Sequence, residues 1–214
     1  MSEVSSTIHY LVPTSRINRR FWAPGREFNT GIYAPHEVII RNARLAGPFT
    51  LDDHGFCLGH HDTNITDWEH NYGPTTPYAD QVREVAKRLS SADVVVPMGG
   101  MIRTSGSTDR SRQPPAAEAH VDFTQRSAER IANTIYRKNH PQGPAYRRFI
   151  AFSLWRALSP PPQDMPLALC EDRSVRDNEG AWRCPHTAFR DTSRPEARER
   201  WSMEFRGMAY FTGS

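Results

Sequence analysis

Residues 120–122 read His-Val-Asp, and this short stretch predicts both the fold and the chemistry of the chain. Side chains alternate along an extended strand, so His120 and Asp122 point in the same direction. An imidazole from elsewhere, His186, would complete three protein ligands on one face of an octahedron. Two histidines and one carboxylate with three open positions are typical of catalytic non-haem Fe(II) sites. We therefore predict an iron site at the mouth of a β-barrel, with His120, Asp122 and His186 as its ligands.

Two polar residues follow His186 at a distance where a second strand would return to the same barrel mouth. The guanidinium of Arg200 is suited to hold the far carboxylate of 2-oxoglutarate through two parallel hydrogen bonds, and the Ser202 hydroxyl would donate beside it. Arg198 and Arg206 compete with Arg200 for this role. The ligand set and the arginine together predict an enzyme, a non-haem Fe(II)/2-oxoglutarate-dependent dioxygenase that uses O2.

The same segment admits a second interpretation. On a strand, the polar side chains of residues 200–206 share one face and the apolar side chains share the other. If the polar face is solvated, it carries no chemistry. If it faces the barrel interior, a buried arginine requires an anionic partner, because an unpaired buried charge is costly. Arg200 and Ser202 would then bind the cosubstrate, and Glu204 would neutralise Arg206.

A His-x-Asp pattern also arises by chance, and the chain contains a second one at residues 60–62. That copy lies among turn-forming residues, so we assign it to a loop. The first copy has more suitable neighbours, because the polar, proline-containing segment 105–117 precedes His120 and a periodic segment follows it. Taken by itself, a lone histidine such as His186 is more typical of a core or capping role than of a metal ligand. The metal site therefore depends on the three ligands acting together.

Length and charge narrow the class of protein. The chain has 214 residues, enough for a single domain over residues 1–214 with one core. Its 17 prolines and 13 glycines favour a loop-rich, mainly β protein over a helical bundle. The formal net charge is +3 and the basic residues are dispersed, so we expect no nucleic-acid partner. The expected partner is a small-molecule substrate.

The cysteines indicate a reducing compartment. Cys57, Cys170 and Cys184 cannot all pair within one chain and show no CxxC spacing, which favours a cytoplasmic location. Cys184 is a conceivable metal ligand, but thiolate-rich sites favour zinc, copper or iron–sulfur chemistry. The N-terminus has no basic segment followed by an apolar run, and no segment approaches transmembrane length. We therefore predict no membrane partner.

Hydrophobic periodicity predicts the elements. Apolar side chains recur at helical spacing in residues 77–89 and 124–137. Alternating or β-branched runs predict strands at residues 36–43, 49–58, 92–97, 148–158, 167–169 and 201–211. Many short strands with few helices favour an α+β protein, built on a double-stranded β-helix (jelly roll, cupin-like) with flanking helices. The loops 105–117 and 159–165 are expected to set substrate selectivity.

Longer motifs carry a family resemblance. They are HEVIIRNAR (36–44), LDDHGFCL (51–58), HVDFT (120–124), SLWRALSPPPQDMPLALCEDRSV (153–175), PHTAFRD (185–191) and ERWSMEFRGMAYF (199–211). With these motifs the chain resembles the bacterial and fungal hydroxylase/desaturase family of non-haem iron oxygenases. That family includes the cephamycin 7α-methoxylation component, gibberellin desaturase-like proteins and meroterpenoid endoperoxide-forming enzymes.

The resemblance implies iron ligands at His120, Asp122 and His186, and 2-oxoglutarate bound at Arg200 and Ser202. It implies oxidation of a small natural product or amino-acid-like metabolite, by hydroxylation, desaturation or related C–H chemistry. One departure is the short connection 176–184, where family members have several tens of residues. This departure suits a reduced barrel, a site completed in a homodimer, or lost activity. Two alternatives therefore stand: an iron oxygenase that does not use 2-oxoglutarate, and an inactive cupin-like binding or accessory protein.

Overall fold

A computed structural model describes residues 3–15, 18–23, 26–106, 112–174, 186–188, 190, 194 and 196–213. The chain divides into two compact units, which are described separately. The first unit comprises Met1–Leu58, Arg103–Val121 and Leu158–Trp201, and the second comprises Gly59–Ile102, Asp122–Ala157 and Ser202–Ser214. The single domain over residues 1–214 stays a prediction.

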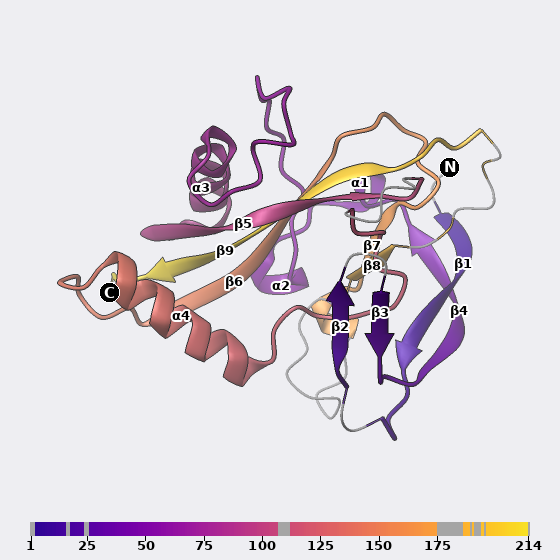
Figure 1. Cartoon of the computed structure of the whole chain (residues 1–214), viewed down its shortest axis with the longest axis horizontal. Helices are drawn as coiled ribbons and strands as arrows, with labels where there is room; N and C mark the ends of the chain where they lie inside the picture. The colour runs from indigo at the N-terminus through magenta and orange to yellow at the C-terminus, as the bar shows by residue number, and fades with distance from the viewer. Residues whose placement is uncertain are drawn as a thin grey trace. The chain divides into compact units, whose positions relative to one another are not determined.

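The second unit is built on a three-stranded sheet (Figure 1). Strand β9 (Trp201–Phe211) lies in the middle, between β5 (Val94–Thr104) and β6 (Arg148–Ala157). Strands β6 and β9 run antiparallel, with Arg148 opposite Phe211. As a central strand, β9 is almost continuously buried along its length. Its backbone hydrogen bonds and both of its faces therefore lie inside the unit.

Two amphipathic helices, α3 (Pro77–Ser90) and α4 (Gln125–Asn139), belong to the same unit, and a threonine side chain caps the start of each. Ala132 and Tyr136 of α4 cluster with Met208 and Tyr210 of β9. Alternate strand residues contact the other helix. Ala86 of α3 lies in one cluster with Ala209, and the ring of Tyr78 lies edge-on to that of Phe205, with centroids 5.7 Å apart. Even-numbered residues of β9 thus face α4, and odd-numbered residues face α3.

The first unit contains three two-stranded sheets among its described residues. Strands β1 (Glu3–Leu11) and β4 (Tyr33–Arg41) form the longest antiparallel pair. Ile8 of β1 and Ala168 of the short strand β7 (Leu167–Leu169) are buried together, and apolar residues of both long strands pack around them. The remaining elements of this unit are β2 (Arg20–Ala23), β3 (Arg26–Asn29), α1 (Ala43–Ala46), α2 (Leu51–His54), β7 (Leu167–Leu169), the 3-10 helix η1 (Asp172–Ser174) and β8 (His186–Ala188).

The α+β class is confirmed, and most predicted elements are present within a few residues of the expected bounds. The strand predicted at residues 49–58 is wrong. The Thr50 side chain accepts the Asp53 N–H and starts the one-turn helix α2, and Gly55, in a left-handed conformation at φ 77°, ends it. These local caps outcompete strand pairing. No helix in the described ranges is long and apolar enough to cross a membrane.

We predict that Phe205→Ala lowers the free energy of unfolding by about 3–5 kcal/mol, because the mutation empties a fully buried site and removes the contact with Tyr78. Urea denaturation measures this loss. Phe28→Ala is the matched control, because Phe28 is 62% exposed. We expect it to cost less than about 1 kcal/mol. Equal losses in the two variants would contradict the assignment of the core to β9.

Candidate functional site

His120 belongs to the segment Arg103–Val121 of the first unit, and its ring nitrogen Nδ1 lies 2.8 Å from the backbone carbonyl oxygen of Glu118. A carbonyl only accepts hydrogen bonds, so Nδ1 carries the proton and donates it. The lone pair of the imidazole is then on Nε2. Metal-binding histidines are commonly fixed in this way, with the second nitrogen donating to a carbonyl or carboxylate. The local geometry of His120 therefore suits a metal ligand.

Asp122 is the first residue of the middle segment of the second unit, and its side chain is 9% exposed. Its Oδ1 accepts a hydrogen bond from Nη2 of Arg206 at 2.8 Å. The same arginine donates from Nε at 3.0 Å and from Nη2 at 2.7 Å to Oε1 of Glu204. The predicted pairing of Glu204 with Arg206 is confirmed. It also extends to a predicted iron ligand, which the sequence did not indicate.

Arg200, which precedes β9, and the polar residues Ser202 and Glu204 of the strand are not solvated. Ser202 is fully buried, and Arg200 and Glu204 are 2% and 6% exposed. The interpretation of this face as a solvated surface is therefore wrong. For Ser202 and Glu204 the physical reason is the central position of β9 between β5 and β6.

Arg200 belongs to the first unit, and its guanidinium donates from Nη1 to the carbonyl oxygen of Met165 at 2.9 Å. Its backbone N–H is directed to Oγ of Ser105 at 2.8 Å and to Oδ1 of Asp164 at 3.0 Å. The Ser105 hydroxyl donates to the same carboxylate oxygen at 2.7 Å. Residues from both predicted selectivity loops therefore contact Arg200, although the sequence alone did not place them together.

His186 begins strand β8, where it pairs with Leu169 of β7. Its side chain and the whole of Cys184 lie outside the described residues. The backbone of β8 is placed by Ala116, whose carbonyl oxygen accepts the Ala188 N–H at 2.7 Å and the Thr187 hydroxyl at 3.2 Å. Ala116 precedes His120 by one short extended segment. The first unit thus brings the chain segments of the two predicted histidine ligands side by side.

The rival His-x-Asp pattern lies on the surface. Nε2 of His60 is 3.3 Å from Oδ1 of Asp62, and the two side chains are 88% and 94% exposed. Neither side chain is held by its surroundings, so this pair does not suit a metal site. Within the described part of the chain, no three His, Cys, Asp or Glu side chains group as a metal centre. The side chain of His186 is not among those compared.

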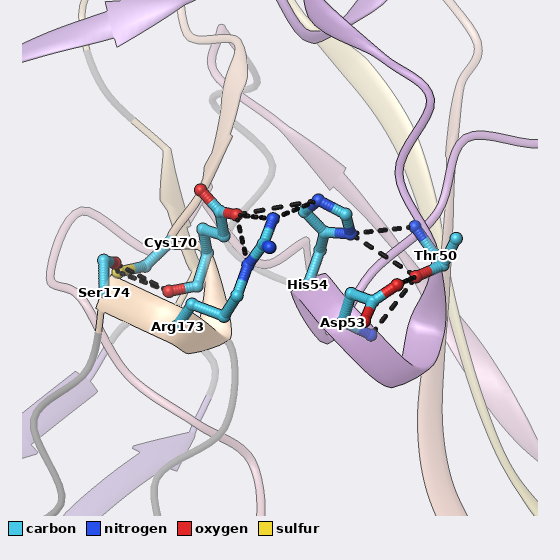
Figure 2. A network of polar contacts seen from close by, with 7 residues as sticks. Thr50, Asp53, His54, Cys170, Arg173 and Ser174 are labelled. Atoms are coloured by element: carbon cyan, nitrogen blue, oxygen red, sulfur yellow. Dashed lines mark hydrogen bonds and ion pairs between the residues drawn. The ribbon is translucent and has the colours of Figure 1, made fainter.

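A polar network that the sequence did not reveal joins α2 to η1 in the first unit (Figure 2). Nε2 of His54 lies 2.7 Å from Nη2 of Arg173 and 3.6 Å from Oε1 of Glu171. Nδ1 of His54 lies 3.1 Å from the backbone nitrogen of Thr50. The residues lie in or next to two short helices far apart in the sequence, so neither of the two motifs that contain them indicates by itself that they meet. Their contacts join these helices, and we assign them a structural role.

A second arginine network lies in the second unit. Arg156 donates from Nε to the Tyr78 hydroxyl at 3.0 Å, and its Nη2 lies 2.7 Å from Nδ1 of His61. Burial lowers the pKa of His61 below its ordinary value, and the positive charge of Arg156 lowers it further. Burial also raises the pKa of the Tyr78 hydroxyl. This network faces α3, on the side of the sheet opposite to Arg206.

We predict that Arg156→Gln raises the pKa of His61, because the imidazolium no longer faces a cation. NMR titration of the ring protons measures the midpoint. The pKa of His61 is lower in the folded state than in the unfolded state. The contribution of neutral His61 to the free energy of unfolding is therefore fully present above the pKa of the unfolded state, and it is lost as the pH falls through the pKa of the folded state. Arg83→Gln is the control, since Arg83 pairs with Asp80 on the surface. An unchanged midpoint in Arg156→Gln would contradict the assignment.

Comparison with known proteins shows the family to which the chain belongs. The family described as Oxidoreductase/YMDC permease-like domain (YDMC) matches residues 8–182. The match covers more than half of the chain, so the chain belongs to this family. The matched residues include His120 and Asp122 and end before His186.

Two curated relatives have oxygenase names. Hydroxylase/desaturase CTB9 of Cercospora beticola is 30% identical over 166 residues, which cover 69% of this chain and 50% of that protein. The Fe(II)/2-oxoglutarate-dependent dioxygenase nvfI of Aspergillus novofumigatus is 28% identical over 158 residues, which cover 71% of this chain and 56% of that protein. The chain spans about half the length of these relatives. The family resemblance predicted from the motifs is confirmed.

Two solved structures share the fold. The iron and alpha-ketoglutarate-dependent endoperoxidase NvfI aligns with a TM-score of 0.77 at 19% identity, covering 99% of both chains. The same protein in a different conformation aligns with a TM-score of 0.78 at 20% identity, covering 100% of this chain and 99% of that one. At this level of identity the likeness concerns the fold alone.

Proposed function

We propose that the chain is an Fe(II)/2-oxoglutarate-dependent oxygenase. Its substrate class is a small natural product or amino-acid-like metabolite, oxidised by hydroxylation, desaturation or related C–H chemistry. The observation that carries the proposal is the pair of hydrogen bonds from β8 to Ala116, which lays the segment of His186 beside the segment of His120. Two relatives also support the proposal, because CTB9 is named a hydroxylase/desaturase and nvfI an Fe(II)/2-oxoglutarate-dependent dioxygenase.

In this proposal Fe(II) is held by His120, Asp122 and His186, and the residues present fit such an ion. With its proton on Nδ1, His120 would offer the lone pair of Nε2 to the metal. A carboxylate has two oxygens, so ligation through one oxygen of Asp122 is compatible with the Arg206 hydrogen bond at the other. When bound, iron and 2-oxoglutarate supply the oxidation of a substrate C–H bond by O2.

The cosubstrate is proposed to bind at Arg200 and Ser202. Both residues are buried, and a buried guanidinium strengthens its interaction with an anion because little water competes. The Ser105–Asp164 contact fixes the backbone of Arg200, which orients its side chain. These residues bind and position the far carboxylate of 2-oxoglutarate and exclude water from it.

The proposal also covers the number of domains, the arrangement of the strands and the cellular location. We propose one domain over residues 1–214, with its strands arranged as a double-stranded β-helix. The support is the antiparallel pairing of β1 with β4, β7 with β8 and β6 with β9. The free thiols of Cys57 and Cys170 suit a cytoplasmic location. Sedimentation of the protein would show whether two chains form a homodimer.

We predict that anaerobic titration of the protein with Fe(II) and 2-oxoglutarate produces the weak visible charge-transfer band of chelated cosubstrate. His186→Ala should abolish the band, because a ligand is lost, whereas His60→Ala at the exposed pair should retain it. Iron binding without the band would identify an oxygenase that does not use 2-oxoglutarate. Absence of iron binding would identify a cupin-like binding protein and contradict the proposal.

We predict that Arg200→Ala raises the KM for 2-oxoglutarate about 10–100-fold, as expected when a buried charged hydrogen bond worth about 1.5–3 kcal/mol is lost. Steady-state kinetics with varied 2-oxoglutarate measure the change. Arg198→Ala is the matched control, because the Arg198 side chain is exposed. A raised KM in Arg198→Ala together with an unchanged KM in Arg200→Ala would assign the clamp to Arg198.

A further inference from the structure

Three charged side chains meet in the second unit at low exposure. The side chains of Arg206, Asp122 and Glu204 are 27%, 9% and 7% exposed, respectively. The guanidinium is shared between the two carboxylates at distances of 2.7 to 3.0 Å. One cation facing two carboxylates is an arrangement with little freedom to rotate, because each partner restrains the other.

The position of this group follows from strand alternation. Glu204 and Arg206 lie on the face of β9 that contacts α4 through Met208 and Tyr210. Asp122 comes just before Thr124, whose side chain caps the start of α4. The contact between Arg206 and Asp122 therefore joins β9 to the residues just before α4. The carboxylate of Asp122 has a fixed partner on a rigid element.

Burial makes this contact important for the orientation of Asp122. An aspartate has few side-chain torsions, and one charged hydrogen bond through Oδ1 selects one orientation of its two oxygens. Without Arg206, two low-exposure carboxylates would lose a shared cation, and the Asp122 side chain would turn toward other donors or water. The direction of Oδ2 would then change.

We propose that Arg206 is a positioning residue for Asp122, and that Glu204 holds Arg206 in place for this task. The inference rests on the proposed function, because it takes Asp122 as an iron ligand. It replaces the cosubstrate-binding role predicted for Arg206, since the Nε and Nη2 donors of Arg206 are directed to carboxylates of the protein. Groups that orient a metal ligand typically change metal affinity 10–100-fold when removed.

The sign of the effect separates positioning from simple electrostatics. Removing a positive charge near a bound divalent cation favours binding by Coulomb's law. Loss of orientation acts in the opposite direction and weakens binding. A lysine at position 206 keeps the charge but has no planar fork, so it cannot reproduce all the contacts of Arg206. If the charge at position 206 alone mattered, Arg206→Lys would bind the metal as tightly as the unmodified protein does.

The experiment measures binding of Co(II), without cosubstrate, to the metal-free full chain by calorimetry and by its visible absorption. We expect Arg206→Gln to weaken Co(II) binding about 10–100-fold and to alter the absorption bands. Arg206→Lys should recover part of the affinity. Arg156→Gln is the matched control, because Arg156 is a half-buried arginine on the neighbouring strand that contacts α3 instead. It should bind Co(II) like the unmodified protein.

Circular dichroism establishes that each variant is folded. If Arg206→Gln does not fold, the double variant Glu204→Gln/Arg206→Gln removes one carboxylate with the cation, and the same loss of affinity is expected. Unchanged or tighter Co(II) binding in the folded Arg206 variants would overturn the positioning role and leave the proposed function intact. Absence of Co(II) binding by the unmodified protein, or unchanged binding by Asp122→Ala, would overturn the proposed iron site and the positioning role with it.

Discussion

The burial of β9 on both faces is the constraint on which the second unit depends. Phe205 and Ala209 face α3, and Met208 and Tyr210 face α4, so helices cover both faces of the strand. A charged residue on such a strand must find its partner inside the protein, because it has little access to water. Glu204 and Arg206 satisfy this requirement with each other and with Asp122. The strand therefore forms the core and also holds a polar group at one end.

Charge burial has a related consequence in the first unit. Arg200 is among the largest fully buried side chains of the protein. Its backbone is fixed by Ser105 and Asp164, and its guanidinium by the carbonyl oxygen of Met165. Loops are usually the most variable parts of a fold. Here two loops are tied to one buried arginine, which gives the predicted cosubstrate site a defined frame.

Local signals predicted some elements well and failed at others for a physical reason. The helices α3 and α4 were predicted because the apolar period and the threonine caps lie within the segment itself. The segment 49–58 has a strand-like composition, yet Thr50 and Gly55 close a single helical turn inside it. A one-turn helix has no periodic signature, so composition alone favoured the wrong element.

The sequence by itself determined the two helices, the main strands, the family and the candidate residues of the site, because periodicity, caps and motif spacing are local properties of the chain. Only the tertiary structure decided which His-x-Asp copy is held in place. Asp122 is 9% exposed and ion-paired, whereas Asp62 is 94% exposed. The tertiary structure also decided that Arg206 binds Asp122 and that β8 lies beside Ala116. Burial and contacts between distant segments depend on how the chain packs, and no local pattern encodes them.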